Sequence, residues 1–566
     1  MKWHSFSPLI KALAFGVLIF IGSCKDNKAD VVDTDEVEIW VPYNDSADVA
    51  ANQDHEISRM RYKLIQSKVQ DKNDIFLPLY KEVKQLSMPS YEELKPLILE
   101  QNIPQIQASI DEGKLTYETL VLFYLHRMYE FELNGTTTLN TIVALNNDVL
   151  EQARKLDKEH TKDMKHHALY GMPILLKDNI GASGMPTTAG AIALADNYAV
   201  DAFIVERLKS KGALLLGKVN LSEWAYFLCK GCPVGYSAIG GQTLNPYGRR
   251  IFETGGSSSG SGTAVAANYA VAAIGTETSG SILSPSSQNS VVGLKPTIGV
   301  LSRGGIVPIS STLDTPGPMT KNVVDNMIVL DAMLGKDNKD SASVAVDYTT
   351  DWYTSLQNTT LKGKRFGVFK NLMEEDSLYG SAIATLEEAG AVIVPFEPKN
   401  VDMNGFLSIL NIDMKNDLPI YIKDNVQNDS KVTVGNIADV INFNKQDSVV
   451  RIPYGQALFE GIMADSTTAV GLEEIKSRLE NSGRSYFDEA LDTHQLDAVL
   501  SINNYHAGYA AVAKYPALTI PMGYREDGEP VSLTFIAKSF QEQKLYELGS
   551  AYEAVSKERR MPKGFE

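Results

Sequence analysis

Two serine-bearing loops and one lysine contain the residue types best suited to nucleophilic chemistry. Every residue in segment 255–262 is glycine or serine, and a helix-forming segment follows it. A second loop, 275–282, contains Ser281, and Lys177 ends a short apolar run. Glycine-rich loops let backbone amides approach a ligand closely. A lysine at the end of a buried strand is partly desolvated, which lowers its pKa toward that of a general base.

Together these segments resemble the motifs of the amidase signature family. That family's pattern is G-[MI]-P, three hydrophobic residues and K-D-N, then G-G-S-S-[SG]-G, then G-T-[ED]-x-x-G-S-I. The three parts occur here in order, at residues 171–179, 255–260 and 275–282. Supporting matches lie at 184–190, 220–224, 240–247, 293–297 and 314–319, and the resemblance covers roughly residues 90 to 556.

The resemblance implies a Ser-cisSer-Lys hydrolase that cleaves amide bonds through an acyl-enzyme. Ser281 would attack the carbonyl carbon, Ser257 would pass on its proton, and neutral Lys177 would receive it before it returns to the leaving nitrogen. No cofactor, metal ion or catalytic histidine is expected. The implied oxyanion hole consists of backbone amides, those of Thr278, Ser279, Gly280 and Ser281.

Departures from the family pattern narrow the expected substrate. Leu283 stands where amino-acid-handling members often carry an arginine, so free glutamine is a less favoured substrate. Segments 301–303 and 307–310 resemble the peptide-amidase-like branch, so peptide amides or small carboxamides are expected. Ser279 replaces a common glycine, and a small serine should preserve the turn if its backbone avoids the glycine-only region.

Beyond residue 170, short apolar runs predict the strands that must position these loops. Segments 174–176, 213–216, 271–274 and 499–502 are apolar apart from Ser501 and do not alternate with polar residues, as in a sheet covered on both faces. A βαβ-like pattern follows between residues 362 and 442. With the resemblance, this predicts an α/β fold, a single large domain (89–566) whose mixed sheet has helices on both faces, preceded by an N-terminal helical extension.

The N-terminus has the pattern of an exported bacterial lipoprotein. Lys2 and Lys11 flank the start of the apolar segment 12–21, which is too short to span a bilayer but suits a signal peptide. The sequence Ile-Gly-Ser before Cys24 resembles a lipobox. We therefore expect a signal peptide (1–23), lipidation of Cys24, a tether and extension (24–88), and a location in the cell envelope, periplasmic or outer-membrane-associated, with membrane contact through the lipid only.

Charge and cysteine spacing limit the other partners. The net charge of −17 disfavours nucleic acid, because phosphates would be repelled by most of the surface. Cys229 and Cys232 are spaced C-x-x-C, which allows either a local disulfide or two buried thiols. A zinc site is disfavoured because no second ligand pair stands nearby. The expected partner is a small-molecule or peptide amide, and the sequence leaves the oligomeric state open.

Three competing interpretations remain at this stage. Segment 256–260 also matches G-x-S-x-G, which would make Ser258 the nucleophile of an α/β-hydrolase-type esterase. A catalytically inactive solute-binding lipoprotein of the same fold is a second alternative. The A subunit of a tRNA-dependent amidotransferase shares the signature, but an exported, acidic chain would not meet aminoacyl-tRNA.

Overall fold

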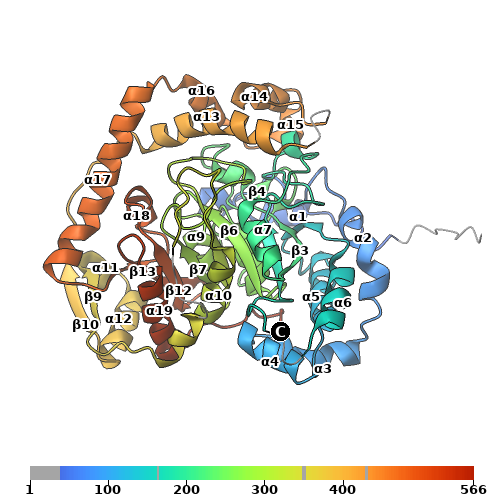
Figure 1. The fold of residues 1–566 in the computed structure, drawn as a ribbon. Coiled ribbons are helices and arrows are strands. Elements are labelled where there is room, and N and C mark those ends of the chain that lie inside the picture. Colours follow the sequence, from blue (N-terminus) through green and yellow to red (C-terminus); the bar gives the residue numbers. More distant parts are fainter. Residues whose placement is uncertain (1–37, 162–164, 347–351, 428–430) are drawn as a thin grey trace, which may run out of the picture. The chain divides into compact units, whose positions relative to one another are not determined.

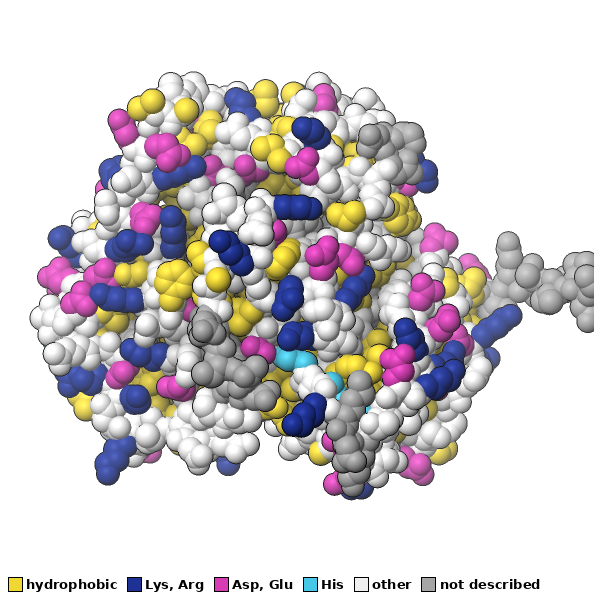
Figure 2. Space-filling model, in the orientation of Figure 1, with side chains coloured by type: hydrophobic (Ala, Val, Ile, Leu, Met, Phe, Trp, Pro, Cys, Tyr) yellow, Lys and Arg dark blue, Asp and Glu magenta, His cyan; other side chains and the backbone are white. Residues whose placement is uncertain are grey.

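The computed structural model describes residues 38–161, 165–346, 352–427 and 431–566. Residues Ile39–Glu566 form one compact unit, so the segment 39–88, expected as an extension, is part of it. The predicted signal peptide and Cys24 lie outside the described residues. Acidic and basic side chains are interspersed over the face shown in Figure 2. Among the described residues, no helix is both long and apolar enough to cross a membrane.

Eleven strands in the described part of the chain form one mixed sheet at the centre of this unit (Figure 1). In spatial order they are β1 (Ile142–Leu145), β3 (Leu214–Val219), β2 (Pro173–Lys177), β6 (Ala272–Glu277), β8 (Thr315–Thr320), β7 (Val292–Lys295), β12 (Ala517–Tyr524), β13 (Pro530–Ile536), β11 (Ala498–Ile502), β9 (Arg365–Phe369) and β10 (Val392–Phe396). A separate pair consists of β4 (Tyr236–Ser237) and β5 (Gly241–Gln242). Parallel pairing of β9 with β10 confirms the predicted βαβ pattern.

Helices surround the sheet. The α-helices are α1 (Ser46–Ala51), α2 (Lys72–Val83), α3 (Met88–Ile98), α4 (Ile103–Asp111), α5 (Tyr117–Glu132), α6 (Val149–Glu159), α7 (Phe203–Ser210), α8 (Ser259–Ala266), α9 (Leu283–Gln288), α10 (Val323–Met333), α11 (Lys370–Glu375), α12 (Ser377–Glu388), α13 (Phe406–Asn425), α14 (Ile437–Lys445), α15 (Ser448–Arg451), α16 (Ala457–Ala464), α17 (Ala469–Thr493), α18 (Ala507–Val512) and α19 (Glu542–Ser556). Short 3-10 helices are η1 (Ser58–Met60), η2 (Ile192–Leu194), η3 (Glu223–Tyr226) and η4 (Trp352–Asn358).

Strand β12 shows that helices cover both faces of the sheet. A Cβ atom at Gly549 of α19 would lie 2.7 Å from the side chains of both Leu518 and Ile520. Ser287 of α9 instead forms a 3.2 Å hydrogen bond with Thr519, the residue between them. Because successive strand residues point to opposite faces, α19 and α9 lie on opposite sides. The predicted α/β fold with a doubly covered mixed sheet is confirmed.

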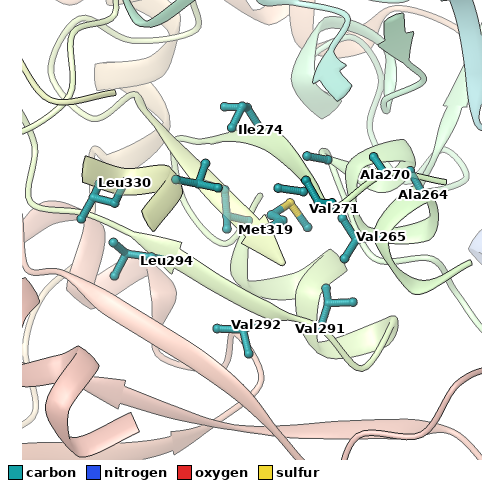
Figure 3. Packing of buried hydrophobic residues seen from close by; sticks show 14 of the residues in the cluster. Ala264, Val265, Ala270, Val271, Ile274, Val291, Val292, Leu294, Met319 and Leu330 are labelled. Atoms are coloured by element: carbon teal, nitrogen blue, oxygen red, sulfur yellow. The ribbon is translucent and has the colours of Figure 1, made fainter. Parts of the chain in front are cut away.

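The centre of the sheet is packed with aliphatic side chains. Figure 3 shows Val265 of α8, Ile274 of β6, Met319 of β8 and Leu294 of β7 within one buried cluster. Each of these side chains is 0% exposed. Burial of this kind removes about 25 cal/mol of free energy per Å² of apolar surface, so the cluster fixes the positions of the strand ends.

A second hydrophobic cluster joins α13, α14, α16 and α17 to the loops above the sheet. Figure 1 shows α13, α14, α15 and α16 grouped at the top of the view. Ile409 and Leu418 of α13 pack in the same cluster as Trp224, Val307 and Ile309. This group of helices is therefore anchored to loops that, as described below, border the candidate active site.

A buried ion pair ties the N-terminal segment to the sheet region. The Lys72 amine at the start of α2 lies 3.0 Å from the Glu132 carboxylate and donates to Thr138 Oγ1 at 2.6 Å. Both charged side chains are buried. Breaking such a pair leaves one charge without compensation, whereas replacing both partners by apolar residues of similar volume is often neutral.

We expect Lys72→Met alone to lower the free energy of unfolding by about 3–5 kcal/mol, because the Glu132 carboxylate stays buried without its cation. The double variant Lys72→Met/Glu132→Leu should recover most of that loss. Urea unfolding of the wild type and of both variants measures this. A double variant no more stable than the single one would contradict the interpretation.

Candidate active site

Lys177 is the last residue of β2, and parallel pairing with β6 brings it beside Thr276. Its side chain is 0% exposed. Nζ donates to Ser257 Oγ at 2.8 Å, to the Thr276 carbonyl oxygen at 3.0 Å and to Thr276 Oγ1 at 2.8 Å. Burial lowers the pKa of Lys177 to about 7, although the carboxylates of Asp314 and Glu277 oppose that shift.

The glycine- and serine-rich loop holds Ser257 directly beside the lysine. Ser257 follows a cis peptide bond from Gly256 and precedes α8. The next residue, Ser258, donates its backbone N–H to the Ser281 carbonyl oxygen at 3.2 Å, which joins this loop to the one after β6. Ser257 is fully buried, whereas Ser281 keeps 9% exposure. The structure thus brings Lys177, Ser257 and the Ser281 loop together.

The Glu277 carboxylate shapes the turn that carries Ser281. It accepts hydrogen bonds from the backbone amides of Gly280 at 2.7 Å, Ile282 at 2.7 Å and Leu283 at 3.0 Å. Glu277 lies in the third sequence motif, which by itself predicts no role for it. Its position between a strand end and a glycine-containing turn is the signal that could have identified it.

One amide of the predicted oxyanion hole has a hydrogen-bond partner within the protein. The Gly280 amide, predicted to stabilise the oxyanion, donates instead to Glu277 Oε1. In the described residues, the amides of Thr278, Ser279 and Ser281 have no such partner. Gly280 also carries the positive φ of the turn, +83°, and Ser279 does not, so serine preserves the turn as predicted.

Asp314 links the Ser281 loop to the loop before β8. Its carboxylate accepts from Thr278 Oγ1 at 2.5 Å, from the Ile309 amide at 2.8 Å and from the Ser310 amide at 2.9 Å. Burial raises the pKa of Asp314 to about 6, which these hydrogen bonds oppose. Asp314 lies in the matching segment 314–319, which by itself predicts no function for it.

The alternative with Ser258 as nucleophile is wrong. The Ser258 side chain is 0% exposed. Its hydroxyl donates to the Thr276 carbonyl oxygen at 3.0 Å and accepts from the Thr276 amide at 3.2 Å. A nucleophile must face the substrate and a base, whereas this hydroxyl holds the loop against β6.

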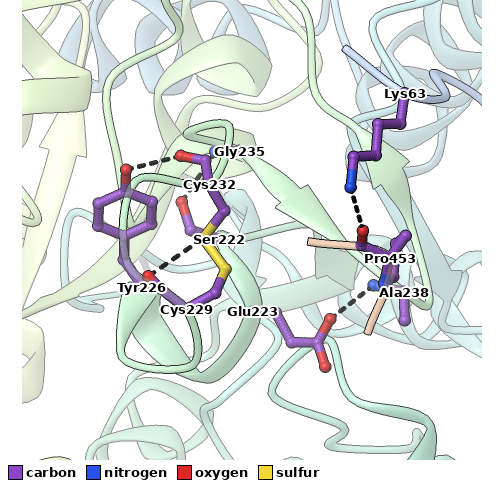
Figure 4. Close-up of a disulfide and its surroundings, with 9 residues drawn as sticks. All are labelled: Lys63, Ser222, Glu223, Tyr226, Cys229, Cys232, Gly235, Ala238 and Pro453. Carbon is purple, nitrogen blue, oxygen red and sulfur yellow. Dashed lines mark hydrogen bonds between the residues drawn. A yellow bond between two sulfur atoms is a disulfide. The ribbon is translucent and has the colours of Figure 1, made fainter. Parts of the chain in front are cut away.

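Cys229 and Cys232 form a disulfide, which decides between the two alternatives left open by the sequence (Figure 4). It closes the loop that follows η3, and the Tyr226 hydroxyl donates to the Cys232 carbonyl oxygen at 2.7 Å. The same segment reaches the site, because the Ser222 amide donates to the Ser257 carbonyl oxygen at 3.0 Å. The disulfide therefore constrains the chain next to Ser222, which is hydrogen-bonded to the loop that carries Ser257.

A cavity of about 720 Å³ adjoins these loops. Its wall includes Asn179, Thr276, Thr278, the segment 303–311 and part of α13. The volume lies within the range of small-molecule binding sites. A larger, open groove along α17 contains none of the reactive residues. Within the described ranges, no group of three or more His, Cys, Asp or Glu side chains could hold a metal ion.

Lys177→Met should stabilise the protein below pH 7, and this stabilisation should decrease as the pH rises. The unfolded chain keeps the Lys177 proton up to about pH 10.5, whereas the folded protein loses it above about pH 7. Between these values the unfolded state binds more protons, so the stability of the wild type increases with pH. We expect the variant's advantage to reach up to about 5 kcal/mol below pH 7 and to fade toward pH 10.5. Urea unfolding across this range measures it; a difference that does not change with pH would contradict the assignment.

Comparison with known proteins agrees with this geometry. The model of the family described as Amidase matches residues 119–412. A probable amidase of Arabidopsis thaliana is 35% identical over 488 residues, which cover 82% of this chain and 92% of the relative.

Two crystal structures share both sequence and fold. An amidase family protein from Bacillus anthracis is 38% identical with a TM-score of 0.83, covering 88% of this chain and 100% of that one. A native peptide amidase from Stenotrophomonas maltophilia is also 38% identical, with a TM-score of 0.76, covering 82% of this chain and 98% of that one. The chain therefore belongs to the amidase family, and it is an enzyme that hydrolyses carbon–nitrogen amide bonds.

Proposed function

We propose that Ser281 is the nucleophile of this amidase and that Ser257 and Lys177 form its proton relay. Ser281 Oγ attacks the amide carbonyl carbon while its proton passes to Ser257 Oγ and the proton of Ser257 passes to Lys177 Nζ. The same route returns a proton to the leaving nitrogen, which departs as ammonia or an amine. Water then hydrolyses the acyl-enzyme. The 2.8 Å contact between Lys177 and Ser257 is the observation that carries this proposal.

The surroundings of Lys177 favour a lone pair directed at Ser257. A neutral amine has two hydrogens and one lone pair. The Thr276 carbonyl oxygen can only accept, so it takes one hydrogen, and Thr276 Oγ1 is placed to take the other. Asn179 Nδ2 also donates to Thr276 Oγ1 at 3.0 Å, which fills that oxygen's accepting capacity. Ser257 is then the partner that donates to the lone pair.

The oxyanion is assigned to the amides of Thr278, Ser279 and Ser281. These donors lie on the turn that Glu277 and Asp314 hold by hydrogen bonds. Donors fixed before the reaction stabilise the developing charge without reorganisation, which is worth about 3–4 kcal/mol for each donor in comparable sites. Three such amides suffice for one oxygen with two or three acceptor positions.

Peptide amides or small carboxamides are the proposed substrates. The similarity to the Stenotrophomonas peptide amidase, at 38% identity over most of both chains, supports this class. Leu283, buried directly after the Ser281 turn, provides no guanidinium for the carboxylate of a free amino acid. Leu283 therefore disfavours an acyl group that carries a carboxylate.

Single substitutions should distinguish the serines and the lysine of the relay from the neighbouring serine, Ser258, by their effect on kcat. Ser281→Ala should lower kcat by at least about 10³-fold, and Lys177→Met and Ser257→Ala by about 10²–10⁴-fold. Ser258→Ala, at the adjacent hydroxyl that bonds only to the Thr276 backbone, should stay within about tenfold of the wild type. The measurement is ammonia release across peptide amides, aliphatic amides, aryl amides and glutamine. Retained turnover in Lys177→Met would overturn the relay, and absence of turnover on every amide would favour a binding protein.

We further propose that the chain is an exported lipoprotein anchored through Cys24. Support comes from the basic start, the apolar segment 12–21 and the cysteine after Gly-Ser. The disulfide between Cys229 and Cys232 is consistent with an oxidising compartment. In bacterial cells fed an alkyne fatty acid, the full-length chain should become labelled and fractionate with membranes, and Cys24→Ser should lose the label. Equal labelling of Cys24→Ser would refute lipidation at this residue.

A further inference from the structure

One face of α13 forms part of the cavity wall beside the reactive loops. The residues of this helix that line the cavity are Asp417, Ile420, Tyr421, Asp424 and Asn425. Their spacing of three, four, seven and eight residues places them along a single helix face. Two carboxylates therefore lie along this face, two turns apart.

Acidic side chains outnumber basic ones around the cavity. Seven carboxylates line it, from Asp201, Glu206, Asp314, Asp337, Asp340, Asp417 and Asp424, against the basic side chains of Arg303, Lys336 and Lys339. Arg303 pairs with Asp340, because its Nε donates to Asp340 Oδ2 at 3.0 Å, and Asp201 pairs with Lys209 at 2.7 Å. Five of the lining carboxylates then remain against two lysines. Lys336 and Lys339 are exposed. This excess differs from the visible surface, where the two signs are interspersed (Figure 2).

The cavity wall also contains the side-chain amide of Asn179, which lies beside Thr276. Its side chain is 3% exposed and lines the cavity. Nδ2 donates to Thr276 Oγ1 at 3.0 Å, whereas Oδ1 has no hydrogen-bond partner among the described residues. A buried acceptor without a partner costs free energy until a donor reaches it. The cavity wall thus contains a buried acceptor without a partner near Thr276, in addition to the carboxylates along α13.

We propose that this cavity binds the acyl part of a positively charged amide, with Asp417 as the residue that determines specificity. A peptide amide with a lysine or arginine side chain, or with a free amino group, supplies positive charge and hydrogen-bond donors. These complement the carboxylates and the amide oxygen of the cavity wall. The inference rests on the proposed function and narrows its substrate class. Asp424, which is exposed at the other end of the helix face, adds a weaker attraction.

Asp417 is better placed than Asp424 to discriminate between charges. It is half-buried, and its Oδ2 accepts the Ser311 amide at 2.7 Å, which fixes the carboxylate in the wall. Burial raises the pKa of Asp417, and a bound cation would favour the charged carboxylate. A fixed, half-buried charge is screened less by water and salt than an exposed one.

Three matched substrates test the proposal: N-acetyl-Lys-Ala-NH₂ and the analogues with norleucine or glutamate in place of lysine. We expect kcat/KM to fall from the lysine to the norleucine to the glutamate amide, with the first two differing about tenfold, as for one close charge pair. Asp417→Asn should bring the ratio of lysine to norleucine close to one, and Asp424→Asn should reduce it partly. Added salt should lower the wild-type ratio.

Glu474→Gln is the matched control, because this exposed carboxylate on α17 lies outside the cavity and should leave the ratio unchanged. A partly unfolded variant lowers all three rates together, so the ratio isolates the charge effect. Equal wild-type rates for lysine and norleucine, or an unchanged ratio in Asp417→Asn, would overturn the proposal. If those rates are equal but Ser281→Ala is inactive, the amidase mechanism stands and only the charge preference fails.

Discussion

The burial of the Lys177 amine is the constraint on which the rest of the site depends. A side chain with no water contact must find protein partners for its hydrogens, and Nζ has three oxygens within 3.0 Å. Two of them belong to Thr276, which the pairing of β2 with β6 fixes in place. Of the two hydroxyl groups among these oxygens, Thr276 Oγ1 also accepts from Asn179 Nδ2, whereas the third oxygen, Ser257 Oγ, lies on the loop joined to the Ser281 turn. In the proposed mechanism, the sheet register therefore directs the amine toward Ser257.

The turn that carries Ser281, the proposed nucleophile, places negative charges near the buried amine, which opposes its neutral form. The turn that carries Ser281 needs an acceptor for its inward-facing amides, and the Glu277 carboxylate supplies it. Asp314 does the same for the neighbouring loop. Both negative charges favour protonated Lys177, whereas burial favours the neutral amine and is the larger effect. The outcome is a pKa of about 7, at which the amine can both accept and return a proton.

The sequence predicts the parts of this arrangement that local patterns encode. Continuous apolar runs such as 174–176 identified buried strands, and the three ordered motifs brought the correct loops together. Local patterns did not reveal that the Gly280 amide is used by Glu277, because that depends on how the turn folds back. They also gave no indication of Asp417, since α13 is distant in sequence from Thr276 and reaches the cavity through the second hydrophobic cluster and through the Ser311 amide that Asp417 accepts.

In the proposed assignments, chemistry and substrate choice are therefore carried by different parts of the fold. Lys177 and Thr276 stand at the ends of adjacent central strands, in the main core, where any shift would disturb many packed side chains. Asp417 stands on α13, whose apolar face packs in the separate cluster with Val307 and Ile309. A change on the cavity face of α13 alters the charge presented to the acyl group without moving either strand. Substrate preference can thus diverge while the proton relay stays unchanged.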